Sequence, residues 1–247
     1  EFFALHARPR PSDRILVLGC SDLLTLAALA ESGQYDVTAT DQSDRRLDAV
    51  MRLARERGLG VTCVRAEQLR CPLPDESFDA VAMFGDSLAR PNDMNQPIVP
   101  LAEAKRLLRP AGTLVLSIDD GDWRRMHFLA DDVEMLPGGF IYRRSELSAD
   151  AERLVTHEFV ASQELGIATD RLSVERLLGA GQILGMLNKC GFEATSFCKR
   201  VTTLPNPSPF SPARPPRLYF SCRTGTRRGA PPRLQLVKNR LTEDAVS

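Results

Sequence analysis

The sequence has little of what marks several common classes of protein. Aromatic residues make up only 6% of its 247 residues, and there are three histidines and one tryptophan. So few aromatic side chains offer little for stacking on nucleic-acid bases. The longest apolar run, residues 23–30, is far shorter than the roughly 20 residues that span a bilayer. These absences argue against a membrane-spanning protein and against a protein that binds single-stranded nucleic acid.

The six cysteines form no metal-binding or redox motif. None belongs to a Cys-x-x-Cys pair, and none has the Cys/His spacing of a zinc site. In a chain of this length we expect reduced, mostly buried thiols, as in cytoplasmic proteins, and no bound metal. The six are Cys20, Cys63, Cys71, Cys190, Cys198 and Cys222.

The formal net charge is zero, but the charges are unevenly placed. Residues 199–240 contain ten Lys and Arg, no Asp or Glu, and eight of the 17 prolines, whereas residues 1–198 carry a net charge of −8. One interpretation is that the basic segment 199–240 contacts an anionic partner. The other is a solvated loop and tail.

Strand-like and helix-like segments alternate along residues 14–118. Short apolar or β-branched runs predict five strands, at 14–19, 36–41, 61–65, 78–84 and 113–118. Apolar residues at helical spacing predict three helices between them, at 22–31, 43–58 and 98–108. This alternation predicts βαβ units and a parallel sheet.

After residue 119 the pattern changes. Alternating residues in 140–147 and 153–165 predict an antiparallel β-hairpin inserted beside the sheet. A helix is predicted at 173–189, although three glycines within it either weaken it, break it or allow another element to approach closely. Two last strands are predicted at 192–198 and 217–223.

Ligands of open parallel sheets bind beyond the carboxyl ends of the strands, so the residues that end strands are the candidates for a site. The first strand ends at Gly19 and turns into a helix through Cys20 and Ser21, where free N–H groups favour an anion. Asp41 ends the second strand, 22 residues after Gly19, a spacing that suits a carboxylate bound to ribose hydroxyls. Glu67 follows the third strand and can accept a hydrogen bond from an exocyclic amine.

Several segments occur in an order found in one large enzyme family. They are residues 15–20 (ILVLGC), Asp41-Gln42, Glu67-Gln68, residues 72–79 (PLPDESFD), 107–116 (LLRPAGTLVL) and 187–192 (LNKCGF). In this order and spacing they resemble the class I S-adenosylmethionine-dependent methyltransferases, especially those that act on small molecules. The resemblance runs from about residue 10 to residue 192 and is strongest over 14–118.

The resemblance implies a fold and a division of the chain. The fold would be α/β, with a Rossmann-like, doubly wound, mostly parallel seven-stranded sheet, an antiparallel last strand and the inserted hairpin. We expect one domain over 1–223, followed by a basic, proline-containing tail over 224–247. Within the domain we expect a cofactor-binding half (10–118), a substrate-side insertion and helix (119–190) and the last two strands (191–223).

The resemblance also implies a function: transfer of a methyl group from S-adenosylmethionine to a small-molecule acceptor by in-line displacement. Asp41 would hold the ribose, and Glu67 would meet the adenine amino group. The residues implied in cofactor binding are Gly19, Cys20, Ser21, Asp41, Gln42, Glu67, Gln68 and Phe84.

Three positions depart from the family's first motif. Val17 stands where the family usually has an acid, and Ser21 and Leu23 stand where it has glycines. Glycine there lets the backbone approach the methionine end of the cofactor. Either the turn is reshaped, with Asp22 or Ser21 making a polar contact, or cofactor binding is weakened.

Two histidines are candidates for a general base. His127 follows the fifth strand, where the family's acceptor pocket usually begins, and His157 lies in the predicted hairpin. Either can take a proton from an acceptor near neutral pH, and either can instead be structural. We expect the N-terminal segment, residues 119–137 and residues 138–165 to form the acceptor pocket.

Other functions remain as alternatives. A nicotinamide-dependent dehydrogenase is disfavoured because the turn lacks the GxGxxG spacing and the chain has no Tyr-x-x-x-Lys pair. Methylation of nucleic acid is disfavoured by the acidic main body. A non-catalytic binding or scaffold module, and an enzyme that keeps the cofactor but performs another reaction, stay open.

Overall fold

The computed structural model describes residues 3, 7–20, 22–67, 70–85, 88–89, 98–136, 138–164, 166–200, 215–224 and 235–236. The chain divides into two compact units. The first unit comprises Glu1–Ile118, Gly181–Arg200 and Leu218–Ser247, and the second comprises Asp119–Ala180 and Val201–Arg217. The expected single domain over 1–223 and tail from 224 stay predictions.

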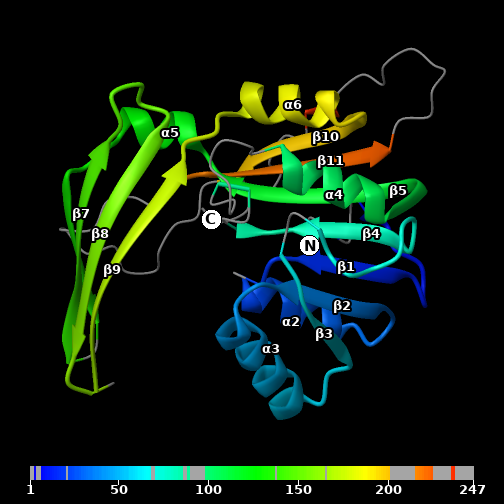
Figure 1. Cartoon of the computed structure of the whole chain (residues 1–247), viewed down its shortest axis with the longest axis horizontal. Helices are drawn as coiled ribbons and strands as arrows, with labels where there is room; N and C mark the ends of the chain where they lie inside the picture. The colour runs from blue at the N-terminus through cyan, green and yellow to red at the C-terminus, as the bar shows by residue number, and fades with distance from the viewer. Residues whose placement is uncertain are drawn as a thin grey trace, which may run out of the picture. The chain divides into compact units, whose positions relative to one another are not determined.

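The first unit is built on a mixed sheet (Figure 1). In the described part of the chain its order is β12-β10-β11-β5-β4-β1-β2-β3. The strands are β1 (Arg14–Leu18), β2 (Asp36–Asp41), β3 (Val61–Arg65), β4 (Phe78–Met83), β5 (Leu108–Asp119), β10 (Phe192–Arg200), β11 (Arg217–Thr224) and β12 (Gln235–Leu236).

The directions of these strands confirm the predicted, mostly parallel sheet. The five strands from β5 to β3 pair in parallel, and β12, a two-residue strand, pairs in parallel with β10. Figure 1 shows β11 running opposite to β10 and β5, as expected for an antiparallel last strand. The chain leaves β1 for β2 on one side and later returns to β4 on the other side of β1. The strand order therefore reverses between β1 and β4, which is where such sheets bind ligands.

Four helices accompany the described strands of this unit: α2 (Leu23–Glu31), α3 (Asp44–Arg57), α4 (Val99–Leu107) and α6 (Ala180–Lys189). The sequence explains the limits of α3. Asp44 lies in its first turn and Arg57 in its last, which suits the helix dipole at both ends. Gly58 ends it in the left-handed conformation, with φ 65°.

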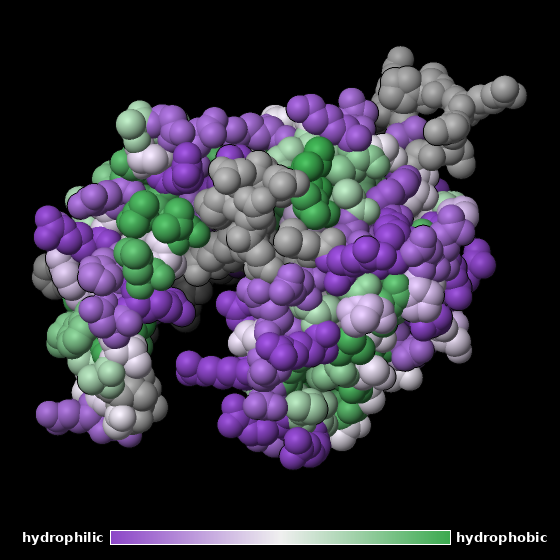
Figure 2. Space-filling view, viewed as in Figure 1, coloured by the Kyte–Doolittle hydropathy of each residue, from purple (hydrophilic) through white to green (hydrophobic). Residues whose placement is uncertain are grey.

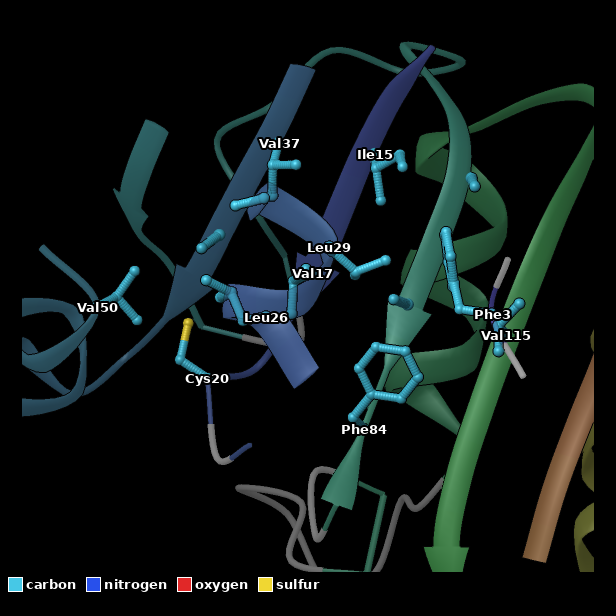
Figure 3. Close-up of a cluster of buried hydrophobic side chains, with 14 of the residues drawn as sticks. Phe3, Ile15, Val17, Cys20, Leu26, Leu29, Val37, Val50, Phe84 and Val115 are labelled. Carbon is cyan, nitrogen blue, oxygen red and sulfur yellow. The ribbon is translucent and has the colours of Figure 1, made fainter. Parts of the chain in front are cut away.

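A cluster of buried hydrophobic side chains holds α2 and α3 against the sheet (Figure 3). Ile15 and Val17 of β1 lie in this cluster with at most 1% of their surface exposed. Leu26 of α2 and Val50 of α3 belong to the same cluster and come from the helices. Because β1 is buried almost throughout, it appears in the sequence as a continuous apolar run.

The second unit contains a four-stranded antiparallel sheet in the order β6-β7-β8-β9 and the short helix α5 (Gly121–Met126). The predicted hairpin is present as β7 (Gly139–Leu147) and β8 (Arg153–Ser162). It is extended on its two sides by β6 (Asp131–Leu136) and β9 (Ile167–Arg176), which the sequence did not predict.

The helix predicted at 173–189 is wrong in its first part. Residues 173–176 belong to β9, where Ser173 pairs with Thr156 of β8, and the helix α6 begins only at Ala180. Of the three glycines, Gly179 precedes α6 and allows close approach of another segment, whereas Gly181 and Gly185 lie within the helix. A Cβ atom on Gly179 would lie 2.1 Å from a carboxylate oxygen of Asp122, whereas one on Gly181 or Gly185 would meet nothing within 4 Å.

The four-stranded sheet has two chemically different faces. One face, which we call the apolar face, exposes five large hydrophobic side chains: Met135, Phe140, Phe159, Leu172 and Val174. On the other face, Arg143 forms ion pairs with Asp132, Glu134 and Glu158 at 2.8 to 2.9 Å. Figure 2 shows hydrophobic residues, in green, at the surface of this sheet.

We predict that Leu26→Ala destabilises the protein by about 3 kcal/mol, because Leu26 is 2% exposed and its removal leaves a cavity in the cluster. Leu24→Ala, two residues earlier in α2, is the matched control and should change stability by less than about 0.5 kcal/mol, since Leu24 is 74% exposed. Urea unfolding followed by circular dichroism measures both. Equal losses would show that α2 packs through a different face.

Candidate functional site

The candidate site lies at the carboxyl ends of adjacent parallel strands. Leu18 at the end of β1 pairs with Thr40, and Asp41 at the end of β2 pairs with Arg65 of β3. Gly19, Asp41 and Glu67 therefore leave neighbouring strands at the same edge of the sheet. The first motif and the two predicted acids are brought together as the strand order requires.

The turn after β1 depends on a glycine. Gly19 has φ 91°, a conformation that residues with a side chain rarely adopt, and its N–H donates to the Thr40 carbonyl at 2.8 Å. The chain then enters α2, which Asp22 caps by accepting from the Thr25 N–H at 3.0 Å and the Thr25 hydroxyl at 2.8 Å. No side chain projects from the turn at Gly19.

Asp41 is a buried carboxylate held by donors from three directions. Its Oδ2 accepts from the Cys20 N–H at 2.8 Å, and its Oδ1 accepts from the Ser43 N–H at 2.9 Å. A guanidinium nitrogen of Arg46 lies 3.4 Å from Oδ2. Only 2% of Asp41 is exposed, so this negative charge is held in place by hydrogen bonds rather than by water.

The side chain of Cys20 faces the core. Its Sγ lies 3.5 Å from the Thr40 carbonyl oxygen, and Figure 3 shows the sulfur pointing toward Leu26. Burial and the nearby charge of Asp41 raise the pKa of this thiol to about 12. Cys20 therefore contributes its backbone N–H to the site and keeps its thiol protonated.

Leu23 occupies a position where the family has a glycine, but its side chain is turned toward the core. Its side chain is partly buried and packs against the hydrophobic cluster. The neighbouring Leu24 is the exposed one, and it belongs to the second position of α2. Ser21, the other departure from the motif, lies outside the described residues.

The segment that carries Glu67 is anchored to α4 by a buried acid. Glu67 is exposed and forms an isolated β-bridge with Arg70. The next residue, Cys71, donates its N–H to Glu103 at 2.6 Å, and Arg106 donates to the same carboxylate at 2.6 Å and to the Cys71 carbonyl at 3.1 Å. Arg106 thus fixes the end of this segment, while Gln68 lies outside the described residues.

Gln42 and Phe84 differ in their surroundings. Gln42, directly after Asp41, is exposed. Phe84 is buried at the end of β4, with its ring edge-on to that of Phe3 at 6.2 Å between centroids. Gln42 therefore has an exposed side chain at this edge of the sheet, and Phe84 contributes to packing.

The two histidines both lie in the second unit and are exposed. His127 follows α5 and stacks on Trp123, with 4.2 Å between ring centroids and 13° between planes. Its Nδ1 lies 2.9 Å from the Trp123 carbonyl oxygen. His157 of β8 lies on the apolar face, with Nε2 2.9 Å from a carboxylate oxygen of Asp170 in β9.

These contacts assign the protons of both imidazoles. A carbonyl oxygen can only accept, so His127 Nδ1 is the donor and Nε2 keeps its lone pair when the ring is neutral. By the same argument, a neutral His157 donates from Nε2 to the Asp170 carboxylate and keeps its lone pair on Nδ1. Each histidine is therefore able to accept a proton on its other nitrogen.

Two arginines of the site were not singled out from the sequence. Arg46 contacts Asp41 from the first turns of α3, and Arg106 organises the segment around Cys71 from α4. The contact of Arg46 with Asp41 could have been predicted from the sequence. When an acid ends a strand and a helix follows, a basic residue in the first turns of that helix can reach back to the acid. No pattern in the sequence distinguishes Arg106 from the other arginines.

The structure also bears on metal ligation and on membrane insertion. Within the ranges that it describes, no group of three or more His, Cys, Asp or Glu side chains is arranged to hold a metal ion. No helix in those same ranges has the length and apolarity needed to cross a membrane.

The arrangement fits an adenosyl amino acid. The turn at Gly19 carries no side chain, and the Asp41 carboxylate lies at the neighbouring strand end. Glu67 is exposed one strand further on, where a base would lie. The fold is Rossmann-like, and these strand-ending residues lie at the edge of the sheet where such folds bind ligands.

Comparison with known proteins finds that part of this chain is similar to a methyltransferase domain. Residues 15–112, which include the turn and both acids, match the family described as a methyltransferase domain. This match confirms the resemblance to S-adenosylmethionine-dependent methyltransferases that the sequence indicated. No curated protein matches the chain significantly in sequence.

Solved structures agree at the level of the fold. An S-adenosylmethionine-dependent methyltransferase from Clostridium acetobutylicum ATCC 824 has 14% identity and a TM-score of 0.70, covering 90% of this chain and 88% of its own. The CcbJ methyltransferase from Streptomyces caelestis has 21% identity and a TM-score of 0.68, covering 91% and 87%. The amino pentose methyltransferase CalS10 from Micromonospora echinaspora, solved with S-adenosylmethionine bound, has 19% identity and a TM-score of 0.56, covering 89% and 86%.

We predict that native protein at pH 8 is alkylated by iodoacetamide at Cys63 and Cys190 long before Cys20 and Cys222. The first pair is partly exposed, whereas burial raises the pKa of Cys20 and of Cys222 to about 12 and leaves almost no thiolate at pH 8. Mass spectrometry of peptides after timed labelling measures the order. Rapid labelling of Cys20 would show that its side chain faces the ligand and not the core.

Proposed function

We propose that this protein transfers a methyl group from S-adenosylmethionine to a small-molecule acceptor. The observation that carries the proposal is the pair formed by the Gly19 turn and the buried Asp41 carboxylate at adjacent strand ends, within the segment that matches the methyltransferase domain. The Leu23 side chain, one of the departures from the motif, packs against the hydrophobic cluster.

The proposed cofactor contacts follow the strand ends. Asp41 accepts hydrogen bonds from the ribose hydroxyls, and Gln42 lies along the adenine. Glu67 accepts from the adenine amino group, with Gln68 beside it. The amino-acid end of the cofactor lies over the turn after β1, where the positive end of the α2 dipole favours its carboxylate.

When bound, the cofactor supplies a sulfonium methyl group that an acceptor lone pair can attack in line. The protein's share of the reaction is then to hold the acceptor on that line and to exclude water. An acceptor hydroxyl or amine also loses a proton, which a side chain must take if the proton is not acidic. No covalent bond to the protein is required.

We propose His157 and His127 as the two candidates for that base. Each has one nitrogen fixed as a donor, to Asp170 and to the Trp123 carbonyl respectively, and the other nitrogen available for a proton. His157 also lies among the exposed hydrophobic side chains of the apolar face, a surface suited to the apolar part of an acceptor.

The similar structures include proteins that act on small molecules, which supports this acceptor class. CalS10 is an amino pentose methyltransferase and KedS8 from Streptoalloteichus sp. ATCC 53650 is a sugar N-methyltransferase. The [4+2]-cyclase SpnF has the same fold, with 17% identity and a TM-score of 0.58, so a cofactor-retaining enzyme of another reaction type is the alternative. A cytoplasmic location and an anionic partner for residues 199–240 are further proposals that rest on composition alone.

We predict that the protein binds S-adenosylhomocysteine with micromolar affinity and that Asp41→Ala weakens this binding at least about 100-fold. The substitution removes two hydrogen bonds to a charged acceptor, each contributing about 1.5 kcal/mol or more. Isothermal titration calorimetry measures both affinities. Asp44→Ala is the matched control, because Asp44 is an exposed acid of α3 that pairs with Arg65 and should leave binding unchanged.

Other results of that titration would redirect the assignment. Heat only on addition of NADH would indicate a dehydrogenase, and no heat with either ligand would indicate a binding or scaffold module. Binding without any methyl transfer to a panel of hydroxyl- and amine-bearing small molecules would favour the alternative in which the cofactor is retained for another reaction.

We predict that His157→Gln or His127→Gln, whichever removes the base, lowers kcat about 100-fold or more while the affinity for S-adenosylhomocysteine stays unchanged. Release of S-adenosylhomocysteine from an acceptor found by screening measures kcat, and calorimetry measures the affinity. The histidine that is not the base serves as the control. Full kcat in both variants would mean that neither imidazole takes the proton.

A further inference from the structure

We infer that Asp41 has a second task besides holding a ribose: its carboxylate fixes the turn that receives the amino-acid end of the cofactor. This inference rests on the proposed function and concerns the same site. It makes Asp41 a positioning residue for the turn, independently of any hydroxyl that it binds.

The contact that carries the inference is the hydrogen bond from the Cys20 N–H to Asp41 Oδ2, at 2.8 Å. Both residues are 2% exposed, so water does not compete for this bond. The other oxygen, Oδ1, is held by the Ser43 N–H at 2.9 Å, which fixes the rotation of the carboxylate. The turn after β1 is thereby tied to the end of β2 through a side chain.

The neighbouring side chains explain why Asp41 is the residue that accepts a hydrogen bond from the turn. Val17, which stands where related enzymes carry an acid, is buried in the hydrophobic cluster and offers no acceptor. The carboxylate of Asp22 is used within its own helix, where it accepts from the N–H and hydroxyl of Thr25. Asp41 is the carboxylate that accepts from the backbone of the turn at Cys20.

One carboxylate therefore serves two parts of the ligand. A ribose would bind the lone pairs of Asp41 that the protein leaves, while the bond to Cys20 keeps the turn in shape for the amino-acid end. Loss of the carboxylate then weakens binding even of a ligand that has no ribose hydroxyls. A ribose contact alone would leave such a ligand unaffected.

The test uses S-adenosylhomocysteine and its 2′,3′-dideoxy analogue, titrated into the full chain and into the Asp41→Asn variant. Asparagine has the same shape but one acceptor oxygen and one NH₂ group, so it cannot accept from both Cys20 and Ser43. We expect Asp41→Asn to weaken binding of the dideoxy analogue about ten-fold, the size of one charge-assisted hydrogen bond. Asp44→Asn, on the exposed side of α3, should change neither affinity.

The outcomes separate the inference from the function. If the unmodified protein binds S-adenosylhomocysteine but Asp41→Asn leaves the affinity for the dideoxy analogue unchanged, the second task of Asp41 is refuted and the methyltransferase proposal stands. If the unmodified protein binds neither ligand, the proposed function itself fails.

A second measurement, hydrogen exchange of the Cys20 amide, needs no ligand. In the ligand-free protein, the Cys20 amide should exchange its hydrogen slowly, because it donates to a buried carboxylate. Exchange at the rate of an unprotected amide would overturn the inference. Where Asp41→Asn folds, this protection should be lost at Cys20 and kept in the Asp44→Asn control.

Discussion

The hydrogen bond between the Cys20 amide and the Asp41 carboxylate is the constraint on which the candidate site depends. It joins the ends of two parallel strands through two residues that are 21 positions apart in the chain. The bond forms only because Gly19 turns the backbone at positive φ and brings the next N–H toward β2. A buried carboxylate without such donors would be costly, so the turn and the acid stabilise each other. This hydrogen bond also fixes where α2 and α3 begin, because each helix starts three residues after one of the two bonded residues.

Much of the cofactor-binding half could be predicted from the sequence because its topology is simple. Strands buried on both faces appear as continuous apolar runs, and the helices between them have amphipathic spacing. Once a parallel sheet is inferred, the residues that follow its strands must meet at one edge. Gly19, Asp41 and Glu67 were therefore predicted to be neighbours without any knowledge of their contacts, and the pairing of β1, β2 and β3 places them so.

The features that the sequence did not predict depend on contacts between distant segments. Residues 173–176 have helix-compatible composition, but they pair with β8 and so become part of a strand. The orientation of Leu23 follows from the space that the hydrophobic cluster offers, which no local pattern encodes. The role of Arg106 arises because Glu103 and the Cys71 carbonyl converge on it from two segments. In each case tertiary packing decides between choices that are locally equivalent.

The two-faced sheet of the second unit has a consequence for how it folds. Side chains along a strand alternate between the faces, so shifting one strand by a single residue against its neighbour would exchange the faces. Such a slip in β7 would turn Arg143 to the face that carries Phe159 and separate it from its three acids. A misaligned hairpin is therefore destabilised by the loss of these three ion pairs. The different side chains of the two faces therefore favour the native register of the strands.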